Sequence, residues 1–256
     1  MCWSAGREGC DSPAVPIDYF GEEVAGHYDE DEATMFEPAA VEPAVEFLAR
    51  LAGDRRALEL GIGTGRIALP LRQRGIEVHG IDLSTAMVER LRAKPGGADL
   101  PVTIGDFATT TVGAEFGLVY LVFNTIGNLT TQSQQVACFR NAARHLVSGG
   151  CFVIEVGVPG VLGLPPGETT RVFDLGTDHV GVDEFDVVTQ AATSHHLYRD
   201  GDSWRRGFTP FRYVWPSELD LMAQLAGLTP ADRWGDWDGS PYDRNSTKHI
   251  SVWTRP

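Results

Sequence analysis

Three glycines within five residues, Gly61, Gly63 and Gly65, follow an apolar stretch and precede a helical pattern. A ligand can approach the backbone closely at such a turn, because glycine has no Cβ to block it. The start of the following helix offers unpaired backbone N–H groups to the same ligand. The spacing therefore predicts a small-molecule site, and a tight turn without a ligand is the alternative interpretation.

Asp82 ends the next predicted strand, about twenty residues beyond the first glycine, where a carboxylate can hold both hydroxyls of a ribose. The turn fits the Gly-x-Gly-x-x-Gly fingerprint of dinucleotide sites only in part. Counted from Gly61, the sixth position is Arg66, whereas counted from Gly63 it is Ala68, a tolerated variant. An adenosine-containing ligand is expected, and NAD stays open as an alternative at this point.

Two more polar turns follow later predicted strands. Asp106 can accept a hydrogen bond from an adenine amino group, while Phe107 covers a face of the ring. Phe123 and Asn124 end a buried strand and suit the wall of a site. Each turn alone could be an ordinary strand end, but the four elements together, in this order, favour a nucleotide-type site.

Alternating strands and helices must position these turns. The apolar periodicity predicts strands at 56–60, 77–81, 101–104, 118–123 and 151–156, and helices from Pro43, at 64–74, after a Ser84 cap, and at about 132–147. Short connections between such elements are typical of parallel strands with right-handed crossovers. We therefore expect a doubly wound, mainly parallel α/β sheet with the site at the carboxyl ends of its strands.

The pattern changes after Pro159, where a loop rich in glycine and proline leads to more strand-like segments. We expect strands at 170–175, 186–198 and 204–214, with Asp200-Gly201 as a hairpin turn. They would form an antiparallel insertion over one end of the main sheet. A helix capped by Ser217 and a strand pair at 228–234 and 249–253 would then complete that sheet.

These elements predict three parts of the chain. Residues 1–16 mix glycine, serine, proline and charge and are expected to form a flexible tail. Residues 17–159 and 216–256 are expected to form the ligand-binding α/β domain, with a helix near its N-terminal end. Residues 160–215 are expected to form the antiparallel insertion, as a lid over the substrate.

Composition limits the class of partner. The 256 residues carry a formal net charge of −14, which repels phosphate backbones and makes binding of nucleic acid unexpected. No apolar run reaches the roughly 18–20 residues of a membrane span, and the N-terminal stretch lacks a signal-peptide core. The four cysteines have no metal-site spacing. We expect a cytoplasmic monomer or homodimer that acts on a small molecule, without metal or membrane.

Together the four elements resemble the class I S-adenosylmethionine-dependent methyltransferases, over about residues 57–156. The resemblance implies a Rossmann-like seven-stranded fold, S-adenosyl-L-methionine as methyl donor and S-adenosyl-L-homocysteine as product. It also implies a role for ten residues. They are Gly61, Gly63 and Gly65 at the methionine, Glu59 near its ammonium, Asp82 at the ribose, Leu83 and Phe107 around the adenine, Asp106 at its amino group, and Phe123 and Asn124 behind the methionine and sulfonium.

The insertion is similar to that of the bacterial subgroup that methylates deoxysugars and other natural-product precursors, with the closest local match at 211–219. That resemblance makes Tyr28, Arg212 and Tyr213 candidates for substrate binding, although Arg212 and Tyr213 could instead pair and pack within the insertion. The expected function is N- or O-methylation of a small molecule in bacterial secondary metabolism. An NAD-dependent oxidoreductase and a non-catalytic S-adenosylmethionine-binding protein are the alternatives.

Catalysis of methyl transfer depends mainly on alignment, because a sulfonium is already a strong electrophile. A general base helps when the acceptor must lose a proton. The candidate bases are His195 and His196 on the insertion and His27 near the N-terminal helix. Since neighbouring residues on a strand point to opposite faces, at most one of His195 and His196 can face the site.

Overall fold

The computed structural model describes residues 17–256, so the predicted tail, residues 1–16, lies outside the described residues. A seven-stranded sheet has the order β10-β11-β5-β4-β1-β2-β3, in which β1 to β5 pair in parallel and β11 is antiparallel to both neighbours. This confirms the predicted doubly wound, mainly parallel sheet. Its strands are β1 (Ala57–Leu60), β2 (Val78–Asp82), β3 (Val102–Ile104), β4 (Phe116–Leu121), β5 (Leu146–Gly157), β10 (Thr229–Trp234) and β11 (Lys248–Thr254).

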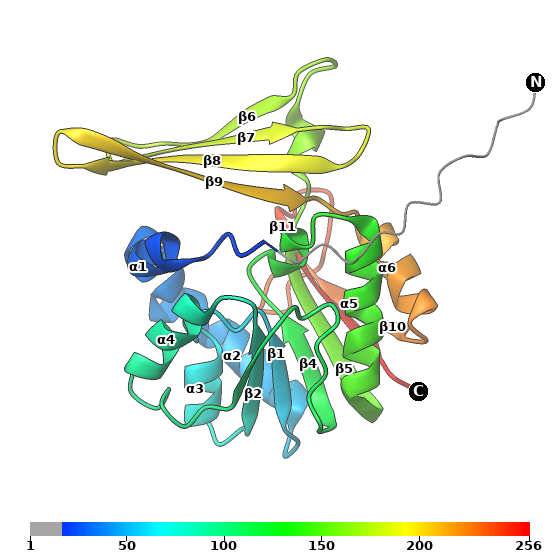
Figure 1. Cartoon of the computed structure of the whole chain (residues 1–256). Helices are drawn as coiled ribbons and strands as arrows, with labels where there is room; N and C mark the ends of the chain where they lie inside the picture. The colour runs from blue at the N-terminus through cyan, green and yellow to red at the C-terminus, as the bar shows by residue number, and fades with distance from the viewer. Residues whose placement is uncertain (1–16) are drawn as a thin grey trace, which may run out of the picture.

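Helices cover both faces of this sheet (Figure 1). One face packs on α2, α3 and α4 around Leu48 and Tyr120, and the other packs on α5 and α6 around Phe139 and Trp253. Burial of these apolar side chains is the main term that stabilises the layers. The helices are α1 (Glu22–Asp31), α2 (Pro38–Ala52), α3 (Ala68–Gln73), α4 (Thr85–Ala93), α5 (Gln132–His145) and α6 (Pro216–Leu225), with 3₁₀ turns η1 (Ala33–Phe36), η2 (Thr125–Asn128) and η3 (Gly160–Gly163).

Several helix boundaries differ from the prediction. The Ser84 cap is confirmed, because its hydroxyl accepts from the Met87 N–H at 3.4 Å. The helix predicted from Pro43 begins at Pro38 instead and keeps Pro43 inside it. The predicted cap at Ser217 is wrong, since Trp215 is the N-cap and Ser217 lies within α6. The predicted helix at 64–74 is wrong in its first turn, because 61–67 form a turn with left-handed glycines before α3.

The strand β5 begins at Leu146, five residues earlier than predicted, and α5 ends at His145. The two glycines expected to end the helix, Gly149 and Gly150, lie within the strand instead. Leu146 pairs with Phe116 across a register shift in β4, so the sheet extends beyond the glycines. Tertiary pairing therefore overrides the local helix-ending signal.

The antiparallel insertion after β5 is confirmed as a four-stranded sheet in the order β6-β7-β8-β9. Its strands are β6 (Thr170–Leu175), β7 (His179–Phe185), β8 (Ala191–Asp200) and β9 (Ser203–Arg212), with the predicted hairpin at Asp200-Gly201. The single strand predicted at 186–198 is wrong, because Asp186 accepts from the Val188 N–H and the Thr189 hydroxyl and begins a turn. The sequence analysis also missed β7.

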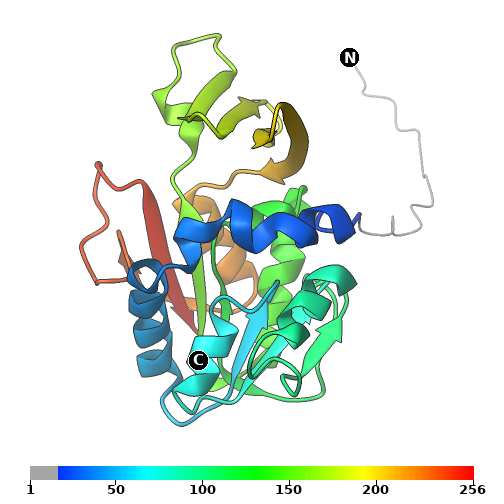
Figure 2. The ribbon, with the colours of Figure 1, turned by 90° about the vertical axis from the view of Figure 1, so that its left-hand side faces the viewer.

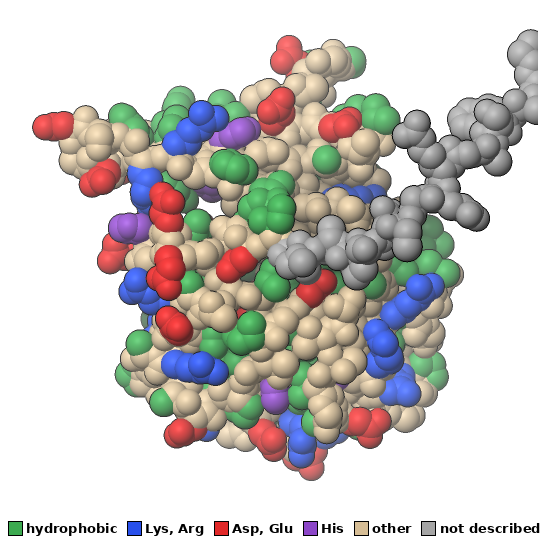
Figure 3. All heavy atoms as spheres, in the orientation of Figure 1, with side chains coloured by type: hydrophobic (Ala, Val, Ile, Leu, Met, Phe, Trp, Pro, Cys, Tyr) green, Lys and Arg blue, Asp and Glu red, His purple; other side chains and the backbone are tan. Residues whose placement is uncertain are grey.

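The four-stranded sheet stands over the carboxyl ends of the parallel strands, and α1 lies across the space between the two sheets (Figures 1 and 2). An ion pair of 2.7 Å joins Arg205 of β9 to Asp31 of α1. On the face shown in Figure 3, Lys and Arg side chains are interspersed with acidic ones. Between residues 17 and 256, no helix is long and apolar enough to cross a membrane.

Candidate active site at the carboxyl ends of the parallel strands

The glycine turn after β1 has a conformation that favours glycine at each position. Gly61, Gly63 and Gly65 have φ angles of +75°, +53° and +82°. A Cβ on Gly61 would also lie 2.5 Å from Cγ2 of Thr125, in the turn after β4. The turn is therefore fixed both by its backbone angles and by the close approach of a neighbouring turn.

Asp82, at the end of β2, is held against this turn by two backbone hydrogen bonds. Its Oδ2 accepts from the Gly63 N–H at 2.7 Å and its Oδ1 accepts from the Ser84 N–H at 2.8 Å. The side chain is buried, with 9% of the residue exposed. Burial raises the pKa of Asp82, and the Gly63 and Ser84 N–H groups oppose that shift. Since a carboxylate can accept about four hydrogen bonds, Asp82 keeps acceptor capacity for a ligand.

Two adjoining cavities contain nine of the ten predicted cofactor residues. One, of about 360 Å³, is lined by Asp82, Leu83, Asp106 and Phe107, together with Gly61 and Gly63. The other, of about 460 Å³, is lined by Glu59, Phe123 and Asn124 and shares the two glycines with the first. The tenth residue, Gly65, lines neither cavity and lies beside the side chains of Leu69 and Leu91.

Glu59, the penultimate residue of β1, is a buried acid in the wall of the larger cavity, with 2% of the residue exposed. Its Oε2 accepts from the Tyr120 hydroxyl at 3.0 Å. Burial raises the pKa of Glu59 to about 8, against the opposing effects of the Tyr120 hydrogen bond and the Arg66 charge. A desolvated carboxyl of this kind gains its ionised form when a cation approaches it.

The turn after β4 has a strained backbone conformation that hydrogen bonds from neighbouring residues hold in place. Phe123 and Asn124 have φ angles of 57° and 60°, which non-glycine residues seldom adopt. The Phe123 N–H donates to Glu155 Oε2 at 2.9 Å, and the Gly157 N–H donates to Asn124 Oδ1 at 2.6 Å. Strain of this kind persists where the surroundings hold the backbone, and it is concentrated at functional sites.

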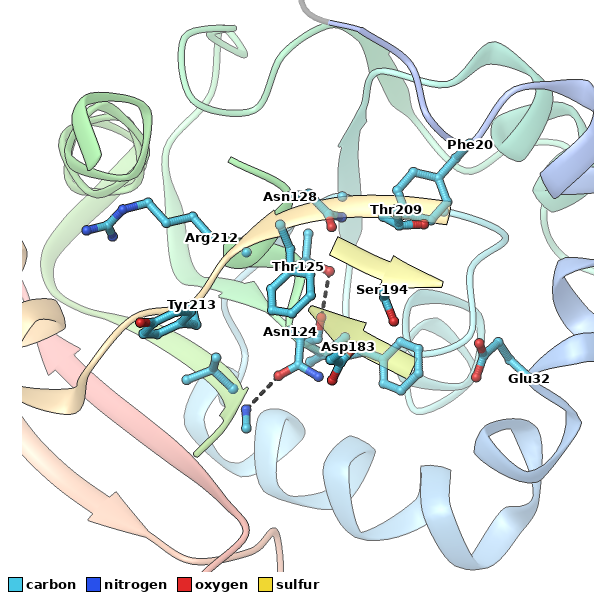
Figure 4. A pocket seen from close by; sticks show the side chains of 18 of the residues that line it. Phe20, Glu32, Asn124, Thr125, Asn128, Asp183, Ser194, Thr209, Arg212 and Tyr213 are labelled. Carbon is cyan, nitrogen blue, oxygen red and sulfur yellow. Dashed lines mark hydrogen bonds between the residues drawn. The ribbon is translucent and has the colours of Figure 1, made fainter. Parts of the chain in front are cut away.

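The larger cavity continues from this turn to the four-stranded sheet. Figure 4 shows Asp183 and Ser194 of that sheet around the same space as Asn124, Thr125 and Glu32. The surface of the wall is mainly apolar and combines aromatic rings with polar groups. Its aromatic residues are Phe20, Tyr28, Phe123, Phe173, Phe185, Phe211 and Tyr213, and its polar residues beyond the first sheet include Glu32, Asp183, Ser194, His196 and Thr209.

Of the three substrate-binding candidates, Tyr28 and Tyr213 line the larger cavity. Arg212 also lines it, but its guanidinium points away from the space (Figure 4). The guanidinium donates to Gln135 Oε1 at 2.6 Å, to Gln190 Oε1 at 2.9 Å and to Glu218 Oε1 at 2.7 Å. The charge of Arg212 is thus paired inside the protein.

The three candidate histidines differ in position. His196 lines the larger cavity, whereas His195 does not, and its Nε2 lies 3.7 Å from Glu184 Oε2. This agrees with the alternation of side chains along a strand. His27 is an exposed residue of α1 and lines neither cavity.

The sequence analysis missed several cavity residues, above all Glu32, Asp183 and Ser194. Asp183 and Ser194 are directly opposite each other on β7 and β8. Ser194 lies between Thr193 and His195, and Asp183 lies between Val182 and Glu184, so no alternation of polar and apolar residues marks either side chain. Only the pairing of β7 with β8 brings the two together.

Known proteins resemble this chain across most of its length. Residues 57–150 match a family model described as a methyltransferase domain. The cypemycin N-terminal methyltransferase of a Streptomyces species is 27% identical over 230 residues, which is 87% of this chain and 92% of that protein. The solved structure of the CcbJ methyltransferase from Streptomyces caelestis has a TM-score of 0.81 and 34% identity, covering 93% of this chain and 98% of that one. The chain is a class I S-adenosylmethionine-dependent methyltransferase.

More distant structures share the fold of this methyltransferase. The SAM-bound structure of CalS10, an amino pentose methyltransferase from Micromonospora echinaspora, has a TM-score of 0.66 at 20% identity and covers 90% of this chain and 96% of that one. The donor is S-adenosylmethionine, which decides against the NAD-dependent alternative, and the chain is an enzyme, which decides against the non-catalytic one. The two cavities suit this donor chemically, with a buried acid beside one cavity and a carboxylate and aromatic ring in the other.

The titration of Glu59 predicts how the stability of this methyltransferase depends on pH. The folded protein holds a proton on Glu59 up to about pH 8, whereas the unfolded chain releases it near pH 4.5. The contribution of Glu59 to the free energy of unfolding therefore falls as the pH rises between these values. Glu59→Gln keeps an acceptor for Tyr120 and removes this titration. We expect the variant to unfold at a temperature similar to wild type at pH 5 and at a higher temperature at pH 8.

Thermal unfolding followed by circular dichroism at four pH values between 5 and 8 makes this comparison. Glu89→Gln, an exposed change on α4, is the matched control. Parallel curves for wild type and Glu59→Gln across this range would contradict the raised pKa.

The ion pair of buried Arg212 with partly buried Glu218 predicts a loss of stability in Arg212→Met. Removing one partner of a buried ion pair leaves the other charge unpaired, which costs roughly 3–5 kcal/mol. We expect a loss of this size in urea unfolding, with exposed Arg206→Met as the control. An unchanged midpoint in Arg212→Met would contradict the structural role and leave direct acceptor binding as the better explanation.

Proposed function

We propose that this methyltransferase transfers the methyl group of S-adenosylmethionine to an amine nitrogen of a small, largely apolar natural-product acceptor. The observation that carries the proposal is the larger cavity, where two carboxyl groups, Glu32 and Asp183, face a mainly apolar space that includes several aromatic rings. Burial raises the pKa of both groups. A protonated amine is the ligand that best offsets the cost of a desolvated carboxylate.

The basic groups of the same wall have partners within the protein, although the charge of Arg66 also acts on Glu32. The Arg66 guanidinium lies 5.1 Å from the centre of the Phe123 ring and donates to the Met35 carbonyl at 3.2 Å. The guanidinium of Arg212 is bonded to Gln135, Gln190 and Glu218, as described above. Aromatic faces also attract cations. The electrostatics of the cavity therefore favour a cationic amine over an acidic or phosphorylated acceptor.

Two relatives with amine substrates in their names support the choice of nitrogen. One is the cypemycin N-terminal methyltransferase. The other, the dTDP-4-amino-2,3,4,6-tetradeoxy-D-glucose N,N-dimethyltransferase of Saccharopolyspora spinosa, is 33% identical over 107 residues, 41% of this chain and 42% of that protein. CalS10 is described as acting in calicheamicin biosynthesis. We accordingly propose a cytoplasmic role in bacterial secondary metabolism, as a monomer or homodimer that does not bind nucleic acid.

We propose that the ten residues assigned by the resemblance form the donor site. Gly65 would stabilise the glycine turn without contacting the donor. Glu59 would pair with the methionine ammonium and Asp82 would accept from the ribose hydroxyls. Leu83 and Phe107 would enclose the adenine, and Asp106 would accept from its amino group. The bound donor supplies an electrophilic methyl group on its sulfonium. Phe123 and Asn124 would form the wall behind that group.

The chain's own task is to align the acceptor nitrogen with that methyl group and to keep water out. Holding two reactants in line can lower the barrier by roughly 7–11 kcal/mol. We propose that residues 160–215 act as the acceptor-binding lid, because the four-stranded sheet contributes Asp183, Ser194 and His196 to the cavity. Tyr28 of α1 and Tyr213 would pack on the acceptor, and His196 is the base candidate that faces it.

A matched pair of model acceptors tests the proposal. We expect transfer of a labelled methyl group to phenethylamine, which combines an aromatic ring with an amine, and not to 2-phenylethanol. Asp183→Asn should raise the KM for phenethylamine by roughly tenfold, which corresponds to ~1.4 kcal/mol. Glu184→Gln is the control, because Glu184 is the next residue on β7 and its side chain is 64% exposed.

Either of two results would contradict the proposal. One is methylation of the alcohol without the amine. The other is an unchanged KM for phenethylamine in Asp183→Asn, which would remove the carboxylate from acceptor binding.

A further inference from the structure

A continuous row of hydrogen bonds crosses the four-stranded sheet from the larger cavity to the surface. Ser194 Oγ, which faces the cavity, lies 3.1 Å from His196 Nε2. His196 Nδ1 lies 3.0 Å from His179 Nε2, and His179 Nδ1 lies 2.6 Å from Asp174 Oδ2. The Asp174 side chain is 47% exposed. The row therefore spans β8, β7 and β6 and ends in solvent.

An ionised carboxylate at the end of the row and two neutral imidazoles give the row one direction, in which the Tyr198 hydroxyl, 3.2 Å from His196 Nδ1, is a second acceptor for that nitrogen. An ionised carboxylate only accepts, so His179 Nδ1 must donate to Asp174. In a neutral imidazole the other nitrogen is then an acceptor, so His179 Nε2 accepts from His196 Nδ1. His196 Nε2 is in turn an acceptor, and Ser194 donates to it. Every O–H and N–H bond in the row is thus directed from the cavity toward the surface.

Packing holds the two imidazoles in this arrangement. The His179 and His196 rings are stacked with centres 5.2 Å apart, and His179 is also stacked on Tyr198 at 4.6 Å. The Phe173 ring meets the His196 ring edge-on at 5.5 Å. Gly181, opposite His196 on β7, leaves the space that the Phe173 ring fills. The rings are therefore enclosed by aromatic neighbours.

We propose that Ser194, His196, His179 and Asp174 form a proton relay that carries a proton of the acceptor ammonium out of the cavity to water. The inference rests on the proposed amine acceptor. Methyl transfer needs the lone pair of a neutral amine, and a protonated amine has none. The relay also gives His196 a partner that accepts the proton it receives.

Each hop breaks one bond to hydrogen and forms another. The ammonium N–H proton passes to Ser194 Oγ as the serine proton passes to His196 Nε2. The Nδ1 proton of His196 passes to His179 Nε2, and the Nδ1 proton of His179 passes to Asp174 and then to water. The sum is one ammonium converted to one neutral amine and one proton in solvent. Rotation of the two imidazoles and the hydroxyl restores the starting direction.

The charges around the two histidines are mixed. Burial is the main cause that lowers the pKa of His196 to about 4, with a further contribution from His179, so the His196 imidazole is neutral at pH 7. The titratable and charged groups that face the pair come from every neighbouring element. They are Asp174 on β6, Asp183 on β7, His195 and Tyr198 on β8, Arg205 on β9, Asp31 on α1 and the adjoining Glu32.

The direction of the row can be measured without any acceptor. We expect ¹⁵N NMR of histidine-labelled protein with S-adenosylhomocysteine at pH 7 to show the Nδ1–H form for both His179 and His196. Asp174→Asn should lower the Nδ1–H fraction of His179, because the amide can donate as well as accept. Asp178→Asn, an exposed change in the adjacent turn, should leave both tautomers unchanged. The Nε2–H form at either histidine in the wild type would overturn the relay.

Kinetics with phenethylamine tests whether the row carries protons. General-base catalysis contributes roughly 10²–10⁴-fold, and we expect His179→Ala to lose about 10- to 100-fold of kcat at pH 7. The KM for phenethylamine and the Kd of S-adenosylhomocysteine should stay unchanged, and added imidazole should restore part of kcat. If His179 only packed within the sheet, its loss would not lower kcat while leaving KM unchanged, and imidazole would not restore kcat.

Two outcomes separate the relay from the proposed function. If wild type methylates phenethylamine and His179→Ala does so at the same rate and with the same pH profile, the relay is wrong and the amine acceptor stands. If phenethylamine is not methylated while both tautomers are as expected, the acceptor proposal fails and the direction of the row stands. Loss of kcat in His195→Gln with an unchanged rate in His196→Gln would also overturn the relay.

Discussion

The position of the Asp82 carboxylate is the constraint on which the site depends. Two backbone N–H groups, of Gly63 and Ser84, hold its oxygens at 2.7 and 2.8 Å. The first bond ties the end of β2 to the glycine turn after β1, and the second ties it to the start of α4. Because both partners are backbone groups, the carboxylate is fixed by the fold itself and faces the smaller cavity with little freedom to move.

The other half of the site is built by a second sheet rather than by the parallel one. The turn at Phe123 and Asn124 closes the donor side, and Asp183 and Ser194 close the opposite side from β7 and β8. In the proposed arrangement, a fixed donor cavity and a separate acceptor wall allow one fold to serve many acceptors. The wall formed by the four-stranded sheet combines aromatic rings with carboxyl groups, and the proposed amine acceptor rests on this combination.

The turns at the ends of the parallel strands could be predicted from the sequence because their features are local. Glycines with left-handed angles, a carboxylate ending a strand and a serine cap all act within a few residues. The acceptor side depends on strand pairing, which brings Asp183 opposite Ser194 and His179 beside His196. No local signal showed β7, so the partners of His196 could not be predicted. Gly149 is a second example. Its residue type predicts the end of a helix, but pairing with the distant strand β4 places it within β5.

The most direct test of this account is the affinity of S-adenosylhomocysteine for Asp82→Asn, measured by isothermal titration beside wild type and the exposed control Asp99→Asn. The amide keeps the size of the side chain but replaces one accepting oxygen by a donor. We predict binding at least roughly tenfold weaker, ~1.4 kcal/mol, in a variant that still unfolds cooperatively. Affinity equal to wild type would contradict the placement of the donor against Asp82.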